Sequence, residues 1–269
     1  MDIYCTRPHC EQPLNSFPDL DDSKFLKTVD LKHCHCCGMP LILDGRYVPL
    51  KLLQRDKLGA TFLSCDLLAP KGKRCTIEQL EIDPSFNTTQ LEIATQLFCH
   101  EAEVLEKLGK HPKIPQIFAF LELTIPAEVP HSQQKFFYLV REYIAGQSLA
   151  AELLVKGKFS ESEVIFVLRE VAKILEFVHF QDTIHRELKP ANIIRDAQGK
   201  IYLVNFGAVK QIGAETIRAT VQMLERNLNS VSTIEYAPGK QHQGQEIYPS
   251  SDLYSLAVTC LNLLTGKLP

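Results

Sequence analysis

The stretch that decides the fold is His185-Arg186-Glu187-Leu188-Lys189-Pro190-Ala191-Asn192, with Asn205-Phe206-Gly207 beginning thirteen residues after Asn192. A helix is predicted just before it, because Ser160 and Glu163 form a capping box, a helix-start signal in which each side chain caps the other residue's backbone N–H. Apolar residues then recur along one face of that helix, namely Val164, Leu168, Val171, Leu175 and Val178. The helix leads the chain directly into the polar stretch.

These two segments resemble the catalytic loop and the metal-binding turn of the eukaryotic-type protein kinases, H-R-D-x-x-x-x-N and D-F-G, in order and separation. Glu187 stands where that family has its proton-accepting aspartate, and Asn205 stands where it has its principal magnesium ligand. Lys189 and Asn192 match the family's phosphate-contacting lysine and second metal ligand. The resemblance implies an α+β, two-lobed kinase-like fold: a small, mainly antiparallel sheet lobe with one helix, then a helical lobe.

The resemblance extends upstream to residues 75–80, which are similar to the V-A-I-K strand that carries the family's phosphate-pairing lysine. Glu78 occupies the lysine position. Opposite charges about 4 Å apart attract by about 4 kcal/mol at an effective dielectric near 20. A carboxylate at position 78 therefore implies a repulsion of similar size between Glu78 and a phosphate group. On a helix predicted at 89–108, Glu101 is the residue best placed to pair with the missing lysine, and the alternative is a solvated surface charge.

The family's glycine loop falls between two paired strands predicted within residues 47–68. Gln54, Asp56 and Gly59 take the three glycine places, so only the last glycine is retained. The resemblance therefore implies a nucleotide cleft that has lost most of its phosphate-cradling backbone.

A buried strand is predicted at 136–144, and the resemblance places the back and the hinge of the adenine pocket on it. Arg141 corresponds to the residue at the back of that pocket, and Glu142 and Ile144 belong to the hinge. A large cation at 141 would narrow or polarise the pocket. The alternative is an edge-strand arginine that points to solvent.

Nine cysteines are present, and five of them lie within the first 37 residues. Four form two pairs, Cys5 with Cys10 and Cys34 with Cys37, and four thiolates suit tetrahedral zinc. A segment this short needs a metal to fold, so we predict a small zinc-ribbon or knuckle unit over residues 1–44 with a structural site at these four cysteines. The competing ligands are Cys36, His9, His33 and His35, and the alternative to a metal site is a disordered, redox-sensitive tail.

Three features together narrow the resemblance: the sequence around 184–194, Asn205 to Lys210, and the Cys34–Gly38 knuckle just before the kinase-like part. They are similar to the bacterial serine/threonine kinases with an N-terminal four-cysteine segment, known chiefly from cyanobacteria. The lobes implied are 45–144 and 145–269. The second is incomplete, because the sequence ends before the last helices of a kinase. Asp252 resembles the helix aspartate that ties the catalytic loop's backbone, and we interpret it as a fold anchor.

The formal charge of −3 gives no electrostatic footprint for nucleic acid or an anionic membrane. The first twenty residues lack an apolar run, so no secretory signal is visible. The longest apolar stretch, 253–264, is too short to span a bilayer and is expected to be a buried helix. We therefore expect a cytoplasmic protein.

The function that the resemblance implies is a pseudokinase, a signalling and regulatory scaffold with no competent catalytic residue. Its partner would be another protein, such as an active kinase or its client. The acidic Glu78 and neutral Asn205 weigh against ATP and Mg²⁺ as ligands. Two alternatives stay open: an unconventional but active serine/threonine kinase that uses ATP, with Glu187 as base and Lys51 or Lys57 as a relocated lysine, and a docking protein whose function lies in the zinc unit.

Overall fold

The structure, a computed structural model, describes residues 1–17, 32–55, 59–70, 72–81, 88–126, 133–206, 210–211, 235–238 and 248–268. The chain divides into two compact units. Unit 1 comprises residues 1–95 and 117–143, and unit 2 comprises residues 96–116 and 144–269. Among the described residues, no helix is both long enough and apolar enough to cross a membrane.

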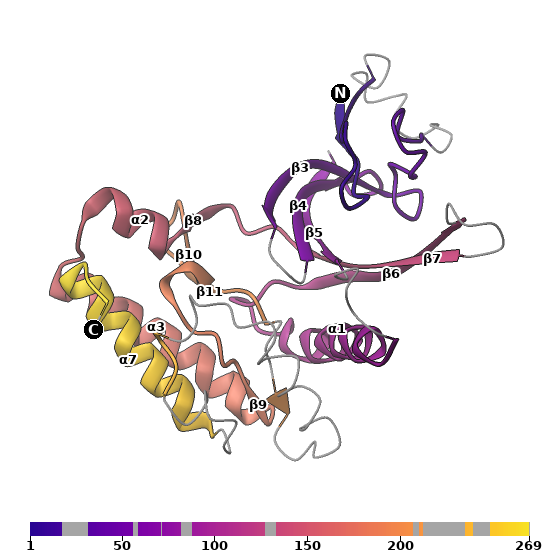
Figure 1. The fold of residues 1–269 in the computed structure, drawn as a ribbon. Coiled ribbons are helices and arrows are strands. Elements are labelled where there is room, and N and C mark those ends of the chain that lie inside the picture. Colours follow the sequence, from indigo (N-terminus) through magenta and orange to yellow (C-terminus); the bar gives the residue numbers. More distant parts are fainter. Residues whose placement is uncertain are drawn as a thin grey trace. The chain divides into compact units, whose positions relative to one another are not determined.

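Unit 1 is built on a five-stranded antiparallel sheet in the order β3-β4-β5-β7-β6 (Figure 1). The strands are β3 (Tyr47–Arg55), β4 (Gly59–Asp66), β5 (Lys73–Leu80), β6 (Ile117–Pro126) and β7 (Gln133–Glu142). The antiparallel pairing of β3 with β4 confirms the two strands predicted within 47–68. The strand predicted at 136–144 is β7, and it lies between β5 and β6 rather than at an edge.

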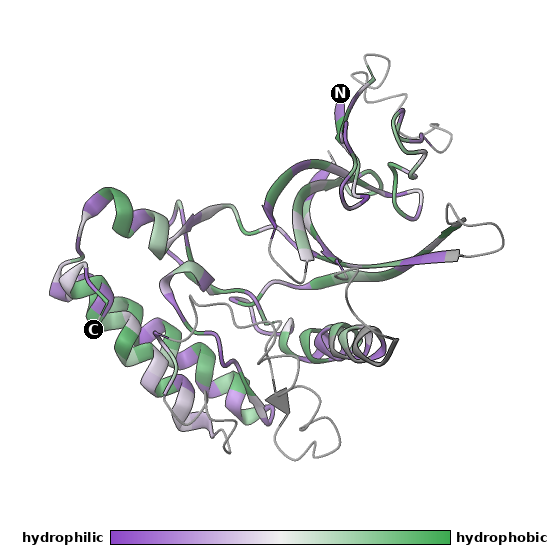
Figure 2. Ribbon diagram, viewed as in Figure 1, coloured by the Kyte–Doolittle hydropathy of each residue, from purple (hydrophilic) through white to green (hydrophobic). Residues whose placement is uncertain are grey.

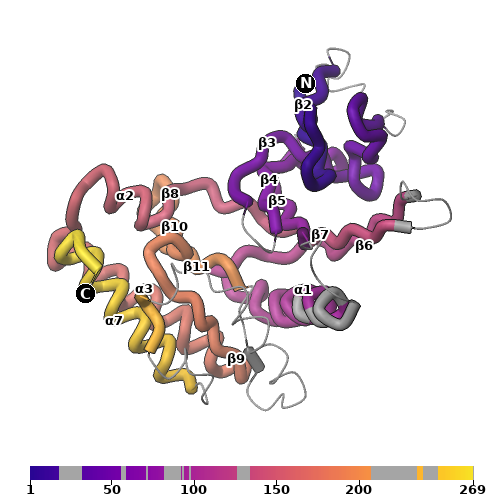
Figure 3. Tube along the Cα trace, in the orientation of Figure 1, coloured from indigo at the N-terminus to yellow at the C-terminus, as the bar shows by residue number. Residues whose placement is uncertain are grey.

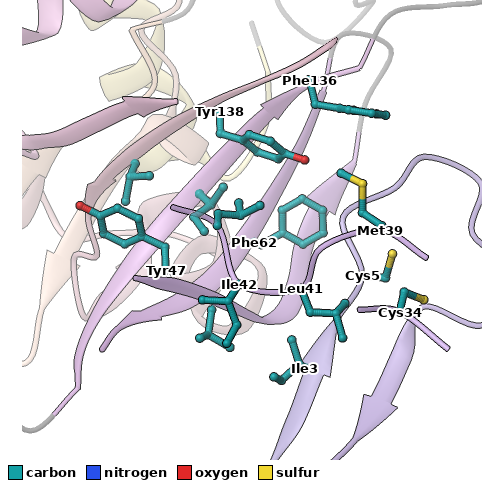
Figure 4. Packing of buried hydrophobic residues seen from close by; sticks show 14 of the residues in the cluster. Ile3, Cys5, Cys34, Met39, Leu41, Ile42, Tyr47, Phe62, Phe136 and Tyr138 are labelled. Carbon is teal, nitrogen blue, oxygen red and sulfur yellow. The ribbon is translucent and has the colours of Figure 1, made fainter. Parts of the chain in front are cut away.

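The N-terminal segment covers one face of this sheet. Its strands β1 (Asp2–Tyr4) and β2 (Leu14–Ser16) pair with each other, and the segment shares one hydrophobic core with the sheet (Figure 4). Buried side chains of this core include Ile3, Met39 and Leu41 from the segment and Phe62, Ile77 and Tyr138 from the sheet. Since fully burying one large apolar side chain contributes about 1.5–3 kcal/mol, the segment and the sheet stabilise each other.

Unit 2 contains α2 (Leu149–Lys156), α3 (Glu161–Phe180) and α7 (Pro249–Thr265), and α3 and α7 run side by side (Figure 3). A small antiparallel sheet has the order β11-β10-β8, formed by Ile201–Leu203, Ile193–Asp196 and Gly146–Ser148. The short strands β9 (Thr183–Ile184) and β12 (Lys210–Gln211) pair separately. Helix α1 (Thr88–Leu108) falls partly in each unit. The mixed α+β class is therefore confirmed.

Helix α3 begins as predicted, since Ser160 Oγ accepts from the Glu163 backbone N–H while Glu163 Oε2 accepts from the Ser160 N–H at 2.9 Å. Its buried face also includes Val167 and Ile174. Leu168 was predicted on that face, which is wrong, because its side chain is 41% exposed. The buried stripe follows the 3.6-residue period through 164, 167 and 171, and position 168 lies on its flank. Figure 2 shows hydrophobic and hydrophilic residues alternating along α3 and α7. Helix α7 confirms the helix predicted at 253–264, but the expectation that it is buried is wrong, because Leu253 and Leu261 are 52% and 49% exposed on the face of α7 that does not pack against α3.

Candidate functional site

The polar stretch 185–192 is held by a buried carboxylate from α7. Asp252 Oδ2 accepts from the His185 backbone N–H at 2.9 Å, and Oδ1 accepts from the Arg186 N–H at 2.8 Å. His179 Nε2, on α3, also lies 2.8 Å from Oδ2. Hydrogen bonds to an ionised acceptor are short and strong, so Asp252 fixes the path of the loop. The predicted role of Asp252 as an anchor of the loop backbone is confirmed.

The loop carries backbone strain, which this anchoring offsets. Arg186 has φ 70° and Asn205 has φ 66°, in the left-handed region. Asparagine adopts that conformation more readily than most residues, whereas a long side chain such as arginine is held there at a cost of about 1–2 kcal/mol. The two hydrogen bonds that Asp252 accepts from the His185 and Arg186 N–H groups provide the compensating contacts for Arg186.

His185 is a structural residue of the loop. Its Nδ1 accepts from the Glu187 N–H at 3.3 Å, and its Nε2 lies 3.3 Å from the Val204 carbonyl, so the ring is neutral with its proton on Nε2. Burial lowers its pKa, which favours that neutral form. The edge of the ring meets Phe206, with centroids 4.7 Å apart. His185 and Phe206 therefore pack the loop against the turn that carries Asn205.

Glu187, Asn192 and Asn205 are brought together in one hydrogen-bonded cluster. Asn192, in the 3₁₀ turn Pro190–Asn192, donates from Nδ2 to the Glu187 carbonyl at 2.7 Å. Asn205 then donates from Nδ2 to Glu187 Oε2 at 3.2 Å and to Asn192 Oδ1 at 3.4 Å. Both acceptors face the Asn205 amide, so its NH₂ group, not its oxygen, is directed into the cluster.

This arrangement does not fit Mg²⁺. A hard cation takes oxygen ligands, preferably anionic, in near-ideal octahedral geometry. Here the N–H groups of Asn205 point at the Glu187 and Asn192 oxygens that a metal at this position would use. An amide nitrogen with two donated hydrogens takes the place of a cation, so these oxygens are satisfied without one.

In unit 1, Glu78 forms an ion pair and hydrogen bond with Arg141 Nη2. Glu78 is opposite Leu139 in the β5–β7 ladder, and Arg141 is opposite Thr76, so the two charged residues are diagonal neighbours on one face. The Arg141 and Glu78 side chains are 11% and 20% exposed. The alternative of a solvent-facing edge-strand arginine is wrong, because β7 is an interior strand and Arg141 is buried.

The structure describes three other predicted nucleotide-cleft positions, Gly59, Glu142 and Ile144. Gly59 opens β4, where an added Cβ would lie 2.4 Å from the Gln79 carbonyl oxygen, so close strand approach explains the glycine. Glu142 ends β7 and lies 4.0 Å from Lys73 Nζ, whereas Ile144 belongs to unit 2. Asp56 and Lys57 lie outside the described residues.

Three further predicted positions can be placed. Lys51 is exposed on β3, and Lys189 is half-buried in the loop of unit 2. Glu101 is only 4% exposed on α1, so its alternative as a solvated surface charge is wrong. Helical spacing puts Glu101 on the buried face of α1, three residues after Phe98 and four before Leu105.

The N-terminal segment gathers the four cysteines that were predicted as ligands, Cys5, Cys10, Cys34 and Cys37. Their sulfurs all lie within 4.8 Å of one another, with Cys5–Cys37 at 3.5 Å and Cys10–Cys34 at 3.7 Å. Zinc bonds of about 2.3 Å in a tetrahedron hold the sulfurs about 3.8 Å apart, so the four thiols fit this ion. The competing ligands Cys36, His9, His33 and His35 are exposed and are not part of the cluster.

The protein supports this cluster with hydrogen bonds to sulfur. The Arg7 N–H donates to Cys5 Sγ at 3.4 Å, and Asn15 Nδ2 donates to Cys34 Sγ at 3.5 Å. Burial raises the pKa of Cys5 and raises that of Cys10 to about 12. Burial opposes ionisation of Cys34 as well, but backbone N–H groups from the 34–38 turn and the Asn15 amide bring its pKa down to about 7. A bound cation would be needed to hold all four sulfurs as thiolates.

Sequence reasoning missed the contacts that join this cluster to the sheet. Thr6 Oγ1 lies 2.9 Å from the hydroxyl of Tyr138 on β7, and Gln79 of β5 donates to the same hydroxyl at 3.3 Å. It also missed the Glu78–Arg141 pair. These partners are 59 to 132 residues apart along the chain, and no local pattern carries such information.

The sequence pattern of the protein kinase domain matches residues 73–269. The chain belongs to the protein kinase family. The match begins at the first residue of β5 and includes all the loop residues of unit 2 described above.

Curated relatives support the same family. The chain is 46% identical over 268 residues to serine/threonine-protein kinase F of Synechocystis sp., covering 99% of this chain and 53% of the relative. It is 35% identical to serine/threonine-protein kinase B of the same organism, covering 99% of this chain and 42% of the relative. It is 37% identical to serine/threonine-protein kinase PknA of Nostoc sp., covering 86% of this chain and 39% of the relative. The chain thus spans about half, or less, of the length of these relatives.

The names of these relatives favour the active-kinase alternative over catalytic impairment.

Proposed function

We propose that this chain is a kinase-family module in which phosphoryl transfer is impaired, and that it acts by binding another protein. The observation that carries the proposal is the donation from the Asn205 amide to Glu187 and Asn192. In this family phosphoryl transfer depends on positioning and electrostatics, with Mg²⁺ neutralising charge on the phosphates. An amide that satisfies the oxygens of the site leaves no anionic ligand at position 205 for that ion.

The pairing of Glu78 with Arg141 supports the same proposal. The family's strand lysine binds phosphate oxygens as a cation, whereas Glu78 is an anion whose charge is balanced inside the sheet. Arg141 is the cation that pairs with Glu78, and its guanidinium is engaged by that carboxylate. A phosphate group would have to compete with Glu78 for it.

The second candidate is an active serine/threonine protein kinase, which the relatives' names favour. We rank it second because the activity in a relative's name applies to this chain only if the chain has the residues that perform that activity. Glu187 does keep a carboxylate at the base position, and Asn192 is retained. This candidate then needs a phosphate-binding cation from elsewhere in the chain.

Transfer of labelled phosphate from ATP, measured with the natural full-length protein, tests the ranking. We expect no incorporation into the protein or a generic substrate at millimolar Mg²⁺ and ATP, and no thermal shift with the same mixture, since an occupied site stabilises by mass action. Incorporation that the Asn192→Ala variant abolishes would reverse the ranking. A variant with Glu78→Lys, Arg141→Met, Glu187→Asp and Asn205→Asp serves as the gain-of-binding control in the thermal assay.

We also propose that the four-cysteine cluster binds a structural zinc ion. Four thiolates complete the tetrahedron, so no position is left open for substrate. One zinc per chain in the purified protein is expected, and its absence after preparation in zinc-containing medium would contradict the assignment. The domain boundaries at 44 and 144 and the choice of an active kinase or its client as the partner also stay proposals.

A further inference from the structure

A buried hydrogen-bond chain runs from the first cysteine knuckle to the middle of the sheet of unit 1. Thr6 follows Cys5 directly, and its hydroxyl meets the Tyr138 hydroxyl at 2.9 Å. Gln79 Nε2 donates to the same Tyr138 oxygen at 3.3 Å. The exposed fractions of Thr6, Gln79 and Tyr138 are 1%, 0% and 0%, so water does not compete for these bonds.

The direction of the hydrogen bonds follows from the donors. The phenol oxygen of Tyr138 accepts from Gln79, so its own hydrogen is available to Thr6 Oγ1. Burial raises the pKa of Tyr138, and the phenol therefore keeps this hydrogen. In Figure 4 the Tyr138 hydroxyl points toward the side of the core where Cys5 and Met39 lie.

The strands that bind Thr6 through these hydrogen bonds, β5 and β7, also carry Glu78 and Arg141. Gln79 and Tyr138 are direct partners in the β5–β7 ladder, and Glu78 precedes Gln79. Arg141 lies three residues beyond Tyr138 in β7. The hydrogen bonds from the knuckle therefore end on the same two strands that hold the Glu78–Arg141 pair.

We propose that metal occupancy at the four-cysteine site orders strands β5 and β7, and that Thr6, Tyr138 and Gln79 transmit this coupling. The metal draws both cysteine pairs together, which fixes Thr6 and so the hydrogen bond that holds Tyr138. Coupling between two sites is reciprocal, so the sheet must also raise the affinity of the site for zinc. The proposal rests on zinc binding and is independent of whether the chain transfers phosphate.

Measuring the zinc affinity of variants tests whether the sheet raises the affinity of the four-cysteine site for zinc. Tyr138→Phe and Thr6→Val each remove one hydroxyl and keep the shape of the side chain. Each is expected to weaken zinc binding about three- to tenfold in competition with a chromophoric chelator. The double variant should lose little more than Tyr138→Phe alone, because that variant already lacks the bond that Thr6→Val removes. Tyr236→Phe is the matched control: it removes a phenol bond of similar length, 3.0 Å to Asn262, in unit 2, and should bind zinc as the unchanged protein does.

Hydrogen exchange with and without zinc tests whether the bound metal orders β5 and β7. Stripping zinc from the unchanged protein should accelerate amide exchange in β5 and β7 and leave β10 and β11 of unit 2 unchanged. In Tyr138→Phe the zinc-dependent difference in β5 and β7 should shrink. Equal zinc affinity in all variants, or β5 and β7 exchange that ignores zinc, would overturn the coupling while the zinc site stands. If the protein binds no zinc, both the coupling and the zinc site are overturned, and the proposal about phosphate transfer is unaffected.

Discussion

Glu78 of β5 and Arg141 of β7 form an ion pair across adjacent strands, in a place where both side chains are largely shielded from water. Removing one member of a buried pair leaves the other charge uncompensated, which destabilises by about 3–5 kcal/mol. The pair therefore explains how unit 1 accommodates an acidic residue at position 78, where the resemblance to the family implies a lysine.

Restoring that lysine alone should be harmful. Glu78→Lys would place a second cation beside Arg141, so we expect it to lower the free energy of unfolding by about 3 kcal/mol or more, and by more than the neutral Glu78→Gln does. Urea unfolding of the three proteins measures this. The charge-swapped double variant, Glu78→Lys with Arg141→Glu, should recover much of the loss. If the double variant loses as much free energy of unfolding as the two single variants together, the two residues do not interact in solution.

Asn205→Asp should create the cation site that the native amide replaces. Its carboxylate would lie about 3 Å from that of Glu187, and the repulsion should lower the melting temperature by several degrees in the absence of divalent ions. Millimolar Mg²⁺ or Mn²⁺ should restore the melting temperature of this variant and leave that of the native protein unchanged. Thermal unfolding with and without each ion is the measurement.

The control for this variant is Asn262→Asp, which adds the same charge at a residue that accepts from the Tyr236 hydroxyl. It should show no response to Mg²⁺. An equal rise in melting temperature for the native protein would show that the loop binds the ion despite Asn205.

Loss of Asp252 should disorder the loop of unit 2. Asp252→Ala leaves the buried N–H groups of His185 and Arg186 without their acceptor, at about 1–3 kcal/mol for each group. Asp252→Asn keeps one acceptor oxygen and should cost less. We expect faster hydrogen exchange at residues 185–192 in the alanine variant. Exchange that stays native in that variant would show that other contacts hold the loop.

Acid sensitivity of unit 1 should depend on Asp66. Arg46 donates to both of its oxygens, at 2.8 and 2.7 Å, and this holds the pKa of the Asp66 carboxyl below its ordinary value of 3.8. A lowered folded-state pKa means that the stabilisation is complete above the unfolded value and is lost as pH falls through the folded value. Asp66→Asn should be about 1 kcal/mol less stable at pH 7, since Arg46 is partly exposed, and the difference should vanish toward pH 2.

Urea midpoints of both proteins between pH 2 and 7 provide this test. The native protein should show the steeper decline below pH 4. Parallel curves for the two proteins would mean that the Arg46 pair contributes nothing to stability.

Local patterns predicted most of the elements and one site. The capping box at Ser160 became the start of one helix and the apolar run at 253–264 became part of another, because each signal lies within a few residues of the chain. Each cysteine pair is a local signal in the same way, and four soft ligands in two pairs predicted the cluster that the structure forms from positions 24 to 32 residues apart. Leu168 shows the limit of local patterns, since a position at the edge of a helix's apolar face is buried or exposed according to the elements that pack beside it.

By itself, the sequence determined the kinase-like loop, the substitutions at 78, 187 and 205, and the four thiols, because these are statements about residue type and spacing. Only the tertiary structure decided what those substitutions contact. The partner of Glu78 is 63 residues away, and the hydroxyl that holds the first knuckle is 132 residues from Thr6. Strand order and register bring such residues together, and both arise from burying a shared core rather than from any local preference.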